Sequence, residues 1–217
     1  PQPLGLPKCP SASQPQGHIR AEPGWKVTTL TLMEQPTKKS GTTPAPASKG
    51  TRILILGAGK MGSFFVDLLC FDHETAVYDT DPHRLRFMYN TLRFTSMEEI
   101  RDFRPQLVIN AVTLKYTIDV FRQVLPYLPE DCILSDIASV KTGLKKFYEE
   151  SGFRYVSTHP MFGPTFASLS NLNTENAIII SEGDHLGKIF FKDLYQTMKL
   201  NIFEYTLSLI HISEPTR

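Results

Sequence analysis

The sequence predicts an α/β fold, with a doubly wound, mostly parallel sheet and helices on both faces. Short apolar runs alternate with helical segments along residues 51–206. The first run, Ile53–Leu56, is apolar at four consecutive positions, which suits a strand buried on both faces of a parallel sheet. It leads directly into Gly57, Gly59 and Gly62, and a helix is expected after them.

The spacing of these glycines is typical of a turn that receives phosphate groups. Gly57 permits the tight turn, Gly59 lets the backbone approach a pyrophosphate, and Gly62 lets a helix over residues 61–71 pack against the strand. The free N–H groups and the positive end of that helix would face the phosphates. Glycine-rich turns also arise for structural reasons, so the next strand decides between the two interpretations. The expected contacts from this turn are Gly57, Gly59, Lys60, Met61 and Gly62.

A second apolar strand, Thr75–Tyr78, ends in an acidic residue. Asp79 lies 22 residues after Gly57, near the spacing expected for a carboxylate that binds the adenosine ribose hydroxyls. Alternatively, Asp79 or Asp81 could simply cap the next helix. We assign the capping role to Asp81, because Pro82 follows it at the first helical position. Strand, glycines, helix, strand and acid therefore predict a Rossmann-type domain that binds NAD.

The remaining elements continue the alternation up to residue 206. Helices are expected over residues 82–90, 96–103, 115–125, 140–150 and 185–200, with Ser96 as the N-cap of the second. Strands are expected over residues 106–112, 132–137, 153–157, 177–181 and 202–205. The chain shows no internal repeat, so residues 51–206 are predicted to form one domain.

Composition excludes several classes of protein. A net charge of +1 gives no reason to expect nucleic acid or an anionic membrane as a partner. The three cysteines, Cys9, Cys70 and Cys132, form no C-x-x-C pair, and no metal site is expected. No apolar run approaches the roughly 20 residues that span a bilayer. Cys70 and Cys132 lie in apolar segments, and we expect them to be buried, reduced thiols of a cytoplasmic protein.

The two ends of the chain differ from the middle. Residues 1–50 hold nine of the sixteen prolines and six Lys/Arg against two Asp/Glu, which predicts a disordered leader and linker. The chain begins without Met. Three origins of residues 1–50 therefore remain open: a native leader, the tail of a fused module, or a miscalled start. Residues 207–217 resemble an in-frame translation of a sequencing adapter, so we exclude them, including His211, from fold and function.

Ligands of open α/β sheets bind beyond the carboxyl ends of the strands. Three segments place polar groups there: Asn110–Thr113, Asp136–Lys141 and Thr158–Pro160. From the first of them, Ala111 and Val112 are expected to contact the cofactor.

Ser139 and His159 are the candidate reactive side chains at this edge. Ser139 is either the N-cap of the following helix or a polar group beside the nicotinamide. His159 is either satisfied by local hydrogen bonds or catalytic, and Pro160 after it favours an extended backbone. His185 is expected at a surface helix start. A Ser and a His at neighbouring strand ends would make an acid/base pair.

Three segments together resemble the prephenate/arogenate dehydrogenases of tyrosine biosynthesis. They are Ile55–Gly62, Asp136–Lys141 and His159–Pro164, and the last, His-Pro-Met-Phe-Gly-Pro, is the most specific. The resemblance covers residues 51–206, the nucleotide-binding domain of that family. The family continues into a helical domain that builds a homodimer and completes the substrate pocket, and this sequence is expected to lack it.

The resemblance implies an NAD-dependent oxidative decarboxylation of prephenate to 4-hydroxyphenylpyruvate. His159 would be the catalytic histidine acting on the ring hydroxyl, and Ser139 would orient it and contact the nicotinamide side. The arginine that binds the substrate carboxylate would come from the helical domain. Arogenate dehydrogenase and a non-catalytic NAD-binding module remain alternatives. A lysine-based β-hydroxyacid-type dehydrogenase fits the Ser139 and His159 motifs less well.

Overall fold

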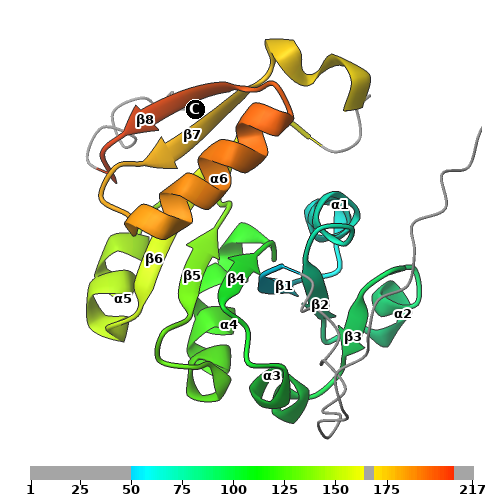
Figure 1. Ribbon diagram of the computed structural model, residues 1–217. Coiled ribbons are helices and arrows are strands. Elements are labelled where there is room, and N and C mark those ends of the chain that lie inside the picture. Colours follow the sequence, from blue (N-terminus) through cyan, green and yellow to red (C-terminus); the bar gives the residue numbers. More distant parts are fainter. Residues whose placement is uncertain (1–49, 164–168, 208–217) are drawn as a thin grey trace, which may run out of the picture. The chain divides into compact units, whose positions relative to one another are not determined.

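The structure, a computed structural model, describes residues 50–163 and 169–207 (Figure 1). The predicted leader over residues 1–50 lies outside the described residues except for Gly50, and the adapter-like segment does so except for Leu207. Pro164, the last residue of the most specific motif, also lies outside them.

An eight-stranded sheet forms the centre of the described region, in the order β3-β2-β1-β4-β5-β6-β7-β8. Its strands are β1 Arg52–Leu56, β2 Glu74–Tyr78, β3 Leu92–Phe94, β4 Leu107–Asn110, β5 Ile133–Asp136, β6 Arg154–Pro160, β7 Asn176–Ile180 and β8 Asn201–Tyr205. Neighbouring strands are parallel except β6 and β7. The predicted mostly parallel sheet is therefore confirmed. Strand order reverses between β1 and β4, which makes a topological switch point.

Helices cover both faces of this sheet (Figure 1). They are α1 Lys60–Leu69, α2 Pro82–Leu85, α3 Met97–Phe103, α4 Thr117–Val124, α5 Leu144–Ser151 and α6 His185–Thr197, with short 3-10 helices η1 Leu114–Tyr116, η2 Leu125–Tyr127 and η3 Leu169–Thr174. One apolar cluster lies under α1 and α6, and the other lies under α3, α4 and α5. Ile53 and Ile55 of β1 face the first cluster, whereas Leu54 and Leu56 face the second. The apolar run is thus buried on both faces, as predicted.

Local signals placed two helix starts correctly. Asp81 is the N-cap of α2, with its side chain accepting a hydrogen bond from the His83 N–H. Ser96 caps α3 in a capping box with Glu99. His185 is exposed at the first position of α6, as expected.

Other boundaries differ from the predictions. The helix expected over residues 82–90 ends at Leu85. Asn90 has φ 57°, and residues 92–94 then pair with β2 as the unpredicted strand β3. The helix expected over residues 115–125 is split into η1 and α4.

Two errors concern the candidate reactive residues. The helix expected from residue 140 begins at Leu144, with Gly143 at φ +78° as its N-cap. Ser139 is therefore not a helix cap. The strand expected to end at residue 157 extends to Pro160, because residues 158–160 pair with β7. His159 thus lies within a strand and not after one.

Gly62 provides a stability test of the turn. A Cβ on Gly62 would lie 1.8 Å from the Gly57 carbonyl oxygen, whereas a Cβ on Gly59 would meet no atom within 4 Å. Gly62→Ala should lower the free energy of unfolding by about 1–3 kcal/mol or more, because backbone has to move. Urea unfolding measures this, with Gly59→Ala as the matched control, expected to change it by less than about 0.5 kcal/mol. Equal effects of the two substitutions would contradict the packing role of Gly62.

Candidate functional site

The turn after β1 brings three segments of backbone together. Gly57 has φ +94°, and its N–H donates to the Tyr78 carbonyl over 2.8 Å. A Cβ on Gly57 would lie 3.1 Å from the Val112 backbone nitrogen, so the turn passes directly against the end of β4. Gly59 is the N-cap of α1, and no described side chain hydrogen-bonds as its cap. The start of α1 thus presents backbone N–H groups beside open space.

Asp79 is fixed against this turn. Its Oδ2 accepts a hydrogen bond from the Ala58 N–H over 2.7 Å, and its Oδ1 accepts one from the Asp81 N–H over 2.8 Å. The side chain is 8% exposed. Arg84 lies nearby, with Nη1 3.9 Å from Asp79 Oδ2 and Nε 3.5 Å from Asp81 Oδ2. Each oxygen of Asp79 still has a second acceptor position, which is the capacity that ribose hydroxyls would need.

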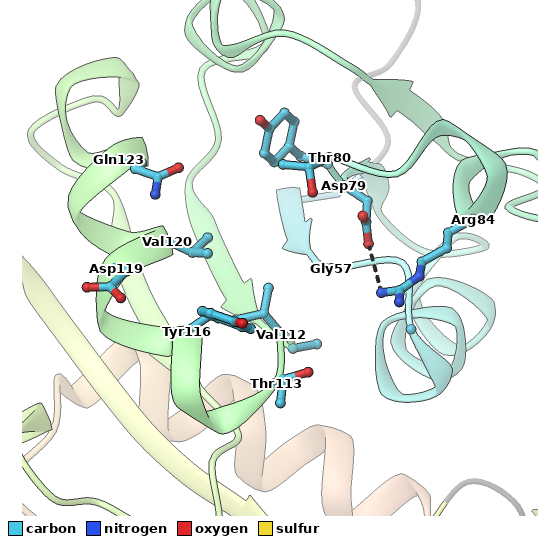
Figure 2. Close-up of a pocket in the computed structure, with 13 residues that line it drawn as sticks. Gly57, Asp79, Thr80, Arg84, Val112, Thr113, Tyr116, Asp119, Val120 and Gln123 are labelled. Atoms are coloured by element: carbon cyan, nitrogen blue, oxygen red, sulfur yellow. Dashed lines mark ion pairs between the residues drawn. The ribbon is translucent and has the colours of Figure 1, made fainter.

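A cavity of about 600 Å³ opens between this turn and α4 (Figure 2). Its lining includes five of the predicted cofactor residues: Gly57, Gly59, Asp79, Ala111 and Val112. In Figure 2, Asp79 and Arg84 lie on one side of the cavity, facing α4 on the other. Burial and the adjacent Asp79 carboxylate raise the pKa of Tyr78, another lining residue, so its hydroxyl remains a donor.

The wall formed by η1 and α4 was not predicted from the sequence. It consists of Tyr116, Asp119, Val120 and Gln123, preceded by Thr113. These helical positions follow the spacing i, i+3, i+4, i+7, so they share one helix face. That spacing, placed just after a predicted strand end, was the signal that could have identified them.

A second cavity of about 400 Å³ adjoins the first and shares Gly59 and Arg84 with it. Lys60, Ser63 and His83 line it, so the predicted contact Lys60 lies there. The other two predicted contacts of the turn lie elsewhere. Met61 packs against the core, and Gly62 is buried under Gly57.

Ser139 and His159 line neither of these two cavities. Ser139 is exposed in the loop between β5 and α5, at the carboxyl end of β5. His159 is half-buried on β6 and pairs with Ile178 of β7. Because Asp136 pairs with Ser157, both candidates follow the last paired residues of two adjacent parallel strands. The structure thus places them at the carboxyl edge of β5 and β6, apart from the cavity at Asp79.

A buried polar network lies beneath these two residues. Asp136 Oδ1 accepts from Lys141 Nζ over 2.5 Å, and Asp136 Oδ2 accepts from the Tyr148 hydroxyl over 2.7 Å. Lys141 Nζ also donates to the Thr158 carbonyl over 2.7 Å. Burial lowers the pKa of Lys141, and the Asp136 carboxylate opposes that shift. Burial and the same carboxylate raise the pKa of Tyr148.

Within residues 50–163 and 169–207, no group of three His, Cys, Asp or Glu side chains is arranged to hold a metal ion. No helix in these ranges is both long and apolar enough to cross a membrane. Burial raises the pKa of the Cys132 thiol to about 12, so this cysteine is a packing residue and not a nucleophile.

A family model for the nucleotide-binding domain of prephenate dehydrogenase matches residues 64–201. A probable arogenate/prephenate dehydrogenase of Methanocaldococcus jannaschii is 34% identical over 99 residues, which are 44% of this chain and 22% of that protein. The chloroplastic arogenate dehydrogenase 1 of Arabidopsis thaliana is 28% identical over 143 residues, which are 58% of this chain and 22% of that protein. The matches thus span about a fifth of each curated relative.

Solved structures share the fold. Prephenate dehydrogenase from Aquifex aeolicus, in complex with hydroxyphenyl propionate and NAD+, superposes with a TM-score of 0.64 at 22% identity. That similarity covers 74% of this chain and 61% of the Aquifex chain. Synechocystis arogenate dehydrogenase gives a TM-score of 0.61 at 14% identity, over 73% and 61% of the two chains.

Proposed function

The chain belongs to the prephenate dehydrogenase family, through its nucleotide-binding domain, and we propose that it serves the NAD-dependent oxidative decarboxylation of prephenate to 4-hydroxyphenylpyruvate. The observation that carries this proposal is the family match over residues 64–201, which contains Asp79, Ser139 and His159. Residues 51–206 form the domain that we assign to the cofactor. We assign no part in the reaction to residues 1–50 or 207–217.

NAD is the cofactor, and the residues present suit it. The cavity beside Gly59 has room where a pyrophosphate would approach the start of α1, and the carboxylate of Asp79 lies at its rim. Gly57, Lys60, Ala111 and Val112 would complete this contact surface. Met61 and Gly62 act by packing α1 in place. When bound, NAD supplies the hydride acceptor.

The chain's own contribution to the chemistry is to align the substrate and hold a proton. Neutral His159 takes the proton of the C4 hydroxyl as hydride leaves C4 and CO2 leaves C1, and the proton then returns to the phenolate oxygen. Formation of the aromatic ring supplies the driving force, so alignment of C4–H is the main requirement. Ser139 lies in the exposed loop after β5, where it would orient His159 and contact the nicotinamide side of bound NAD.

Arogenate is the alternative substrate, since it differs from prephenate only by an amino group in place of the side-chain keto group. The similarity to the Arabidopsis arogenate dehydrogenase favours keeping it. A non-catalytic NAD-binding module is the remaining alternative, because the glycines and Asp79 would suffice for binding. Substrate turnover by a protein that contains this domain would distinguish a dehydrogenase from a non-catalytic NAD-binding module.

The carboxylate of Asp79 predicts a preference for NAD over NADP. It accepts hydrogen bonds from ribose hydroxyls and repels a 2′-phosphate, and tenfold tighter NAD binding corresponds to about 1.4 kcal/mol. Isothermal titration with both cofactors measures it. Arg84, ion-paired with Asp79, is the competing influence, so Arg84→Ala is the matched variant and should leave NAD preferred. Tighter binding of NADP than NAD would contradict the role of Asp79.

Replacement of His159 tests the catalytic assignment in a protein with the complete site. His159→Asn should reduce kcat by about two to four orders of magnitude, with little change in NAD affinity. Unsubstituted enzyme should lose rate as pH falls, because protonated imidazole cannot accept the hydroxyl proton. Steady-state kinetics across pH provide both readouts. Near-normal turnover by the variant would make His159 structural.

The chain by itself should bind NAD without forming NADH from prephenate. Its described residues carry the cofactor contacts, whereas the arginine for the substrate carboxylate is expected from the family's helical domain. The comparison is between this chain and the same chain with residues 207–217 replaced by the helical domain of a relative. The same domain is expected to supply a homodimer interface. Appreciable turnover by the chain alone would show that the substrate site has been misplaced.

A further inference from the structure

Lys141 joins the two segments that carry Ser139 and His159. Its ammonium donates to Asp136, where the Ser139 loop begins, and to the carbonyl of Thr158, the residue before His159. Both Lys141 and Asp136 have side-chain exposures of 0%. One buried cation therefore contacts the base of both candidate segments.

The position of Thr158 explains why a donor is needed there. β5 ends at Asp136, which pairs with Ser157, so Thr158 is the first residue of β6 beyond the last β5 pair. Its carbonyl accepts from Lys141 Nζ instead, and its hydroxyl shares a 2.7 Å hydrogen bond with Tyr195 of α6. A buried carbonyl without a donor is costly, so the lysine stabilises β6 where the neighbouring strand stops.

The same ion pair shapes the loop that carries Ser139. Asp136 Oδ1 accepts from the Ala138 N–H over 3.1 Å as well as from Lys141. The carboxylate of Asp136 therefore holds both the start and the end of the loop. The Lys141 carbonyl then accepts from the Leu144 N–H over 3.1 Å at the start of α5. Ser139 lies between these fixed points, exposed at the surface.

Stability alone does not account for such a pair. Desolvation of two charges offsets much of their attraction, and apolar replacements of similar volume are often as stable. The pair provides a directional hydrogen bond, which an apolar contact does not, because the ammonium fixes the position of a particular carbonyl. We propose that Lys141 is a positioning residue, which holds the Thr158 carbonyl so that His159 stays in register with the Ser139 loop. This proposal rests on the catalytic role proposed for His159.

The test removes both charges together in the 217-residue chain. Lys141→Met alone would leave a buried carboxylate unpaired, so it is combined with Asp136→Asn, which keeps an acceptor for the Ala138 N–H. The matched control is Lys192→Met with Glu204→Gln, which removes the ion pair between α6 and β8. NMR of the imidazole C–H groups is the readout, with the His159 signal assigned by its loss in His159→Gln.

In the double variant, the His159 signal should shift or split, whereas the signals of His73, His83 and His185 should not change. The control pair should leave His159 unmoved. An unchanged His159 signal in a folded double variant would overturn the proposal. If that variant does not fold, Asp136→Asn with Lys141→Gln, which retains polar ends, takes its place. Failure of both to fold would make Lys141 a requirement of folding and also overturn the proposal.

The NMR comparison is separate from the proposed function. Absence of NAD binding by the unmodified chain would count against the cofactor assignment, whereas the His159 signal would still report whether Lys141 positions it. In a protein with the complete site, displacement of His159 by about 1 Å should lower kcat by about a hundredfold. The KM for NAD should change less than kcat, because Lys141 does not line the cavity at Asp79.

Discussion

The contact between Gly62 and the Gly57 carbonyl sets the geometry of the cofactor edge. Space for a side chain at Gly62 is lacking, since a Cβ would lie 1.8 Å from that oxygen. The first turn of α1 therefore rests directly on the turn after β1, and its N–H groups open toward the carboxyl edge of the sheet. The Ala58 N–H of this turn then reaches Asp79, so the position of the carboxylate follows from backbone packing.

The two halves of this edge are held by different physical interactions. At β1 and β2, close backbone packing and one carboxylate suffice, and glycines permit that packing because they have no side chain. At β5 and β6, an ion pair with no solvent exposure joins loop and strand, at the expense of desolvating both charges. The first half can accept a cofactor through N–H groups and one acid, whereas the second holds Ser139 and His159 at the carboxyl ends of β5 and β6.

Features set by neighbouring residues could be predicted from the sequence, whereas features set by contacts between distant segments could not. The caps at Asp81 and Ser96 and the doubly buried strand Ile53–Leu56 depend on near neighbours or on apolar runs, and they were predicted correctly. β3 was missed because only Phe94 of its three residues is buried, so no apolar run marks it. The start of α5 was misplaced because Lys141 precedes the helix and is buried against Asp136. Sequence periodicity cannot show the burial of a lysine.

The site was predictable to a similar extent. Gly57, Gly59, Asp79, Ala111 and Val112 line one cavity, at the strand ends and the glycine turn where the sequence places them. The opposite wall of that cavity was missed because Tyr116, Asp119 and Gln123 have no chemical signature beyond their shared helix face. Prephenate and arogenate have the same ring hydroxyl and differ only at the side chain on C1, across the ring from C4. A histidine that acts at C4 meets the same group in both, so discrimination between them has to come from residues that contact the side chain.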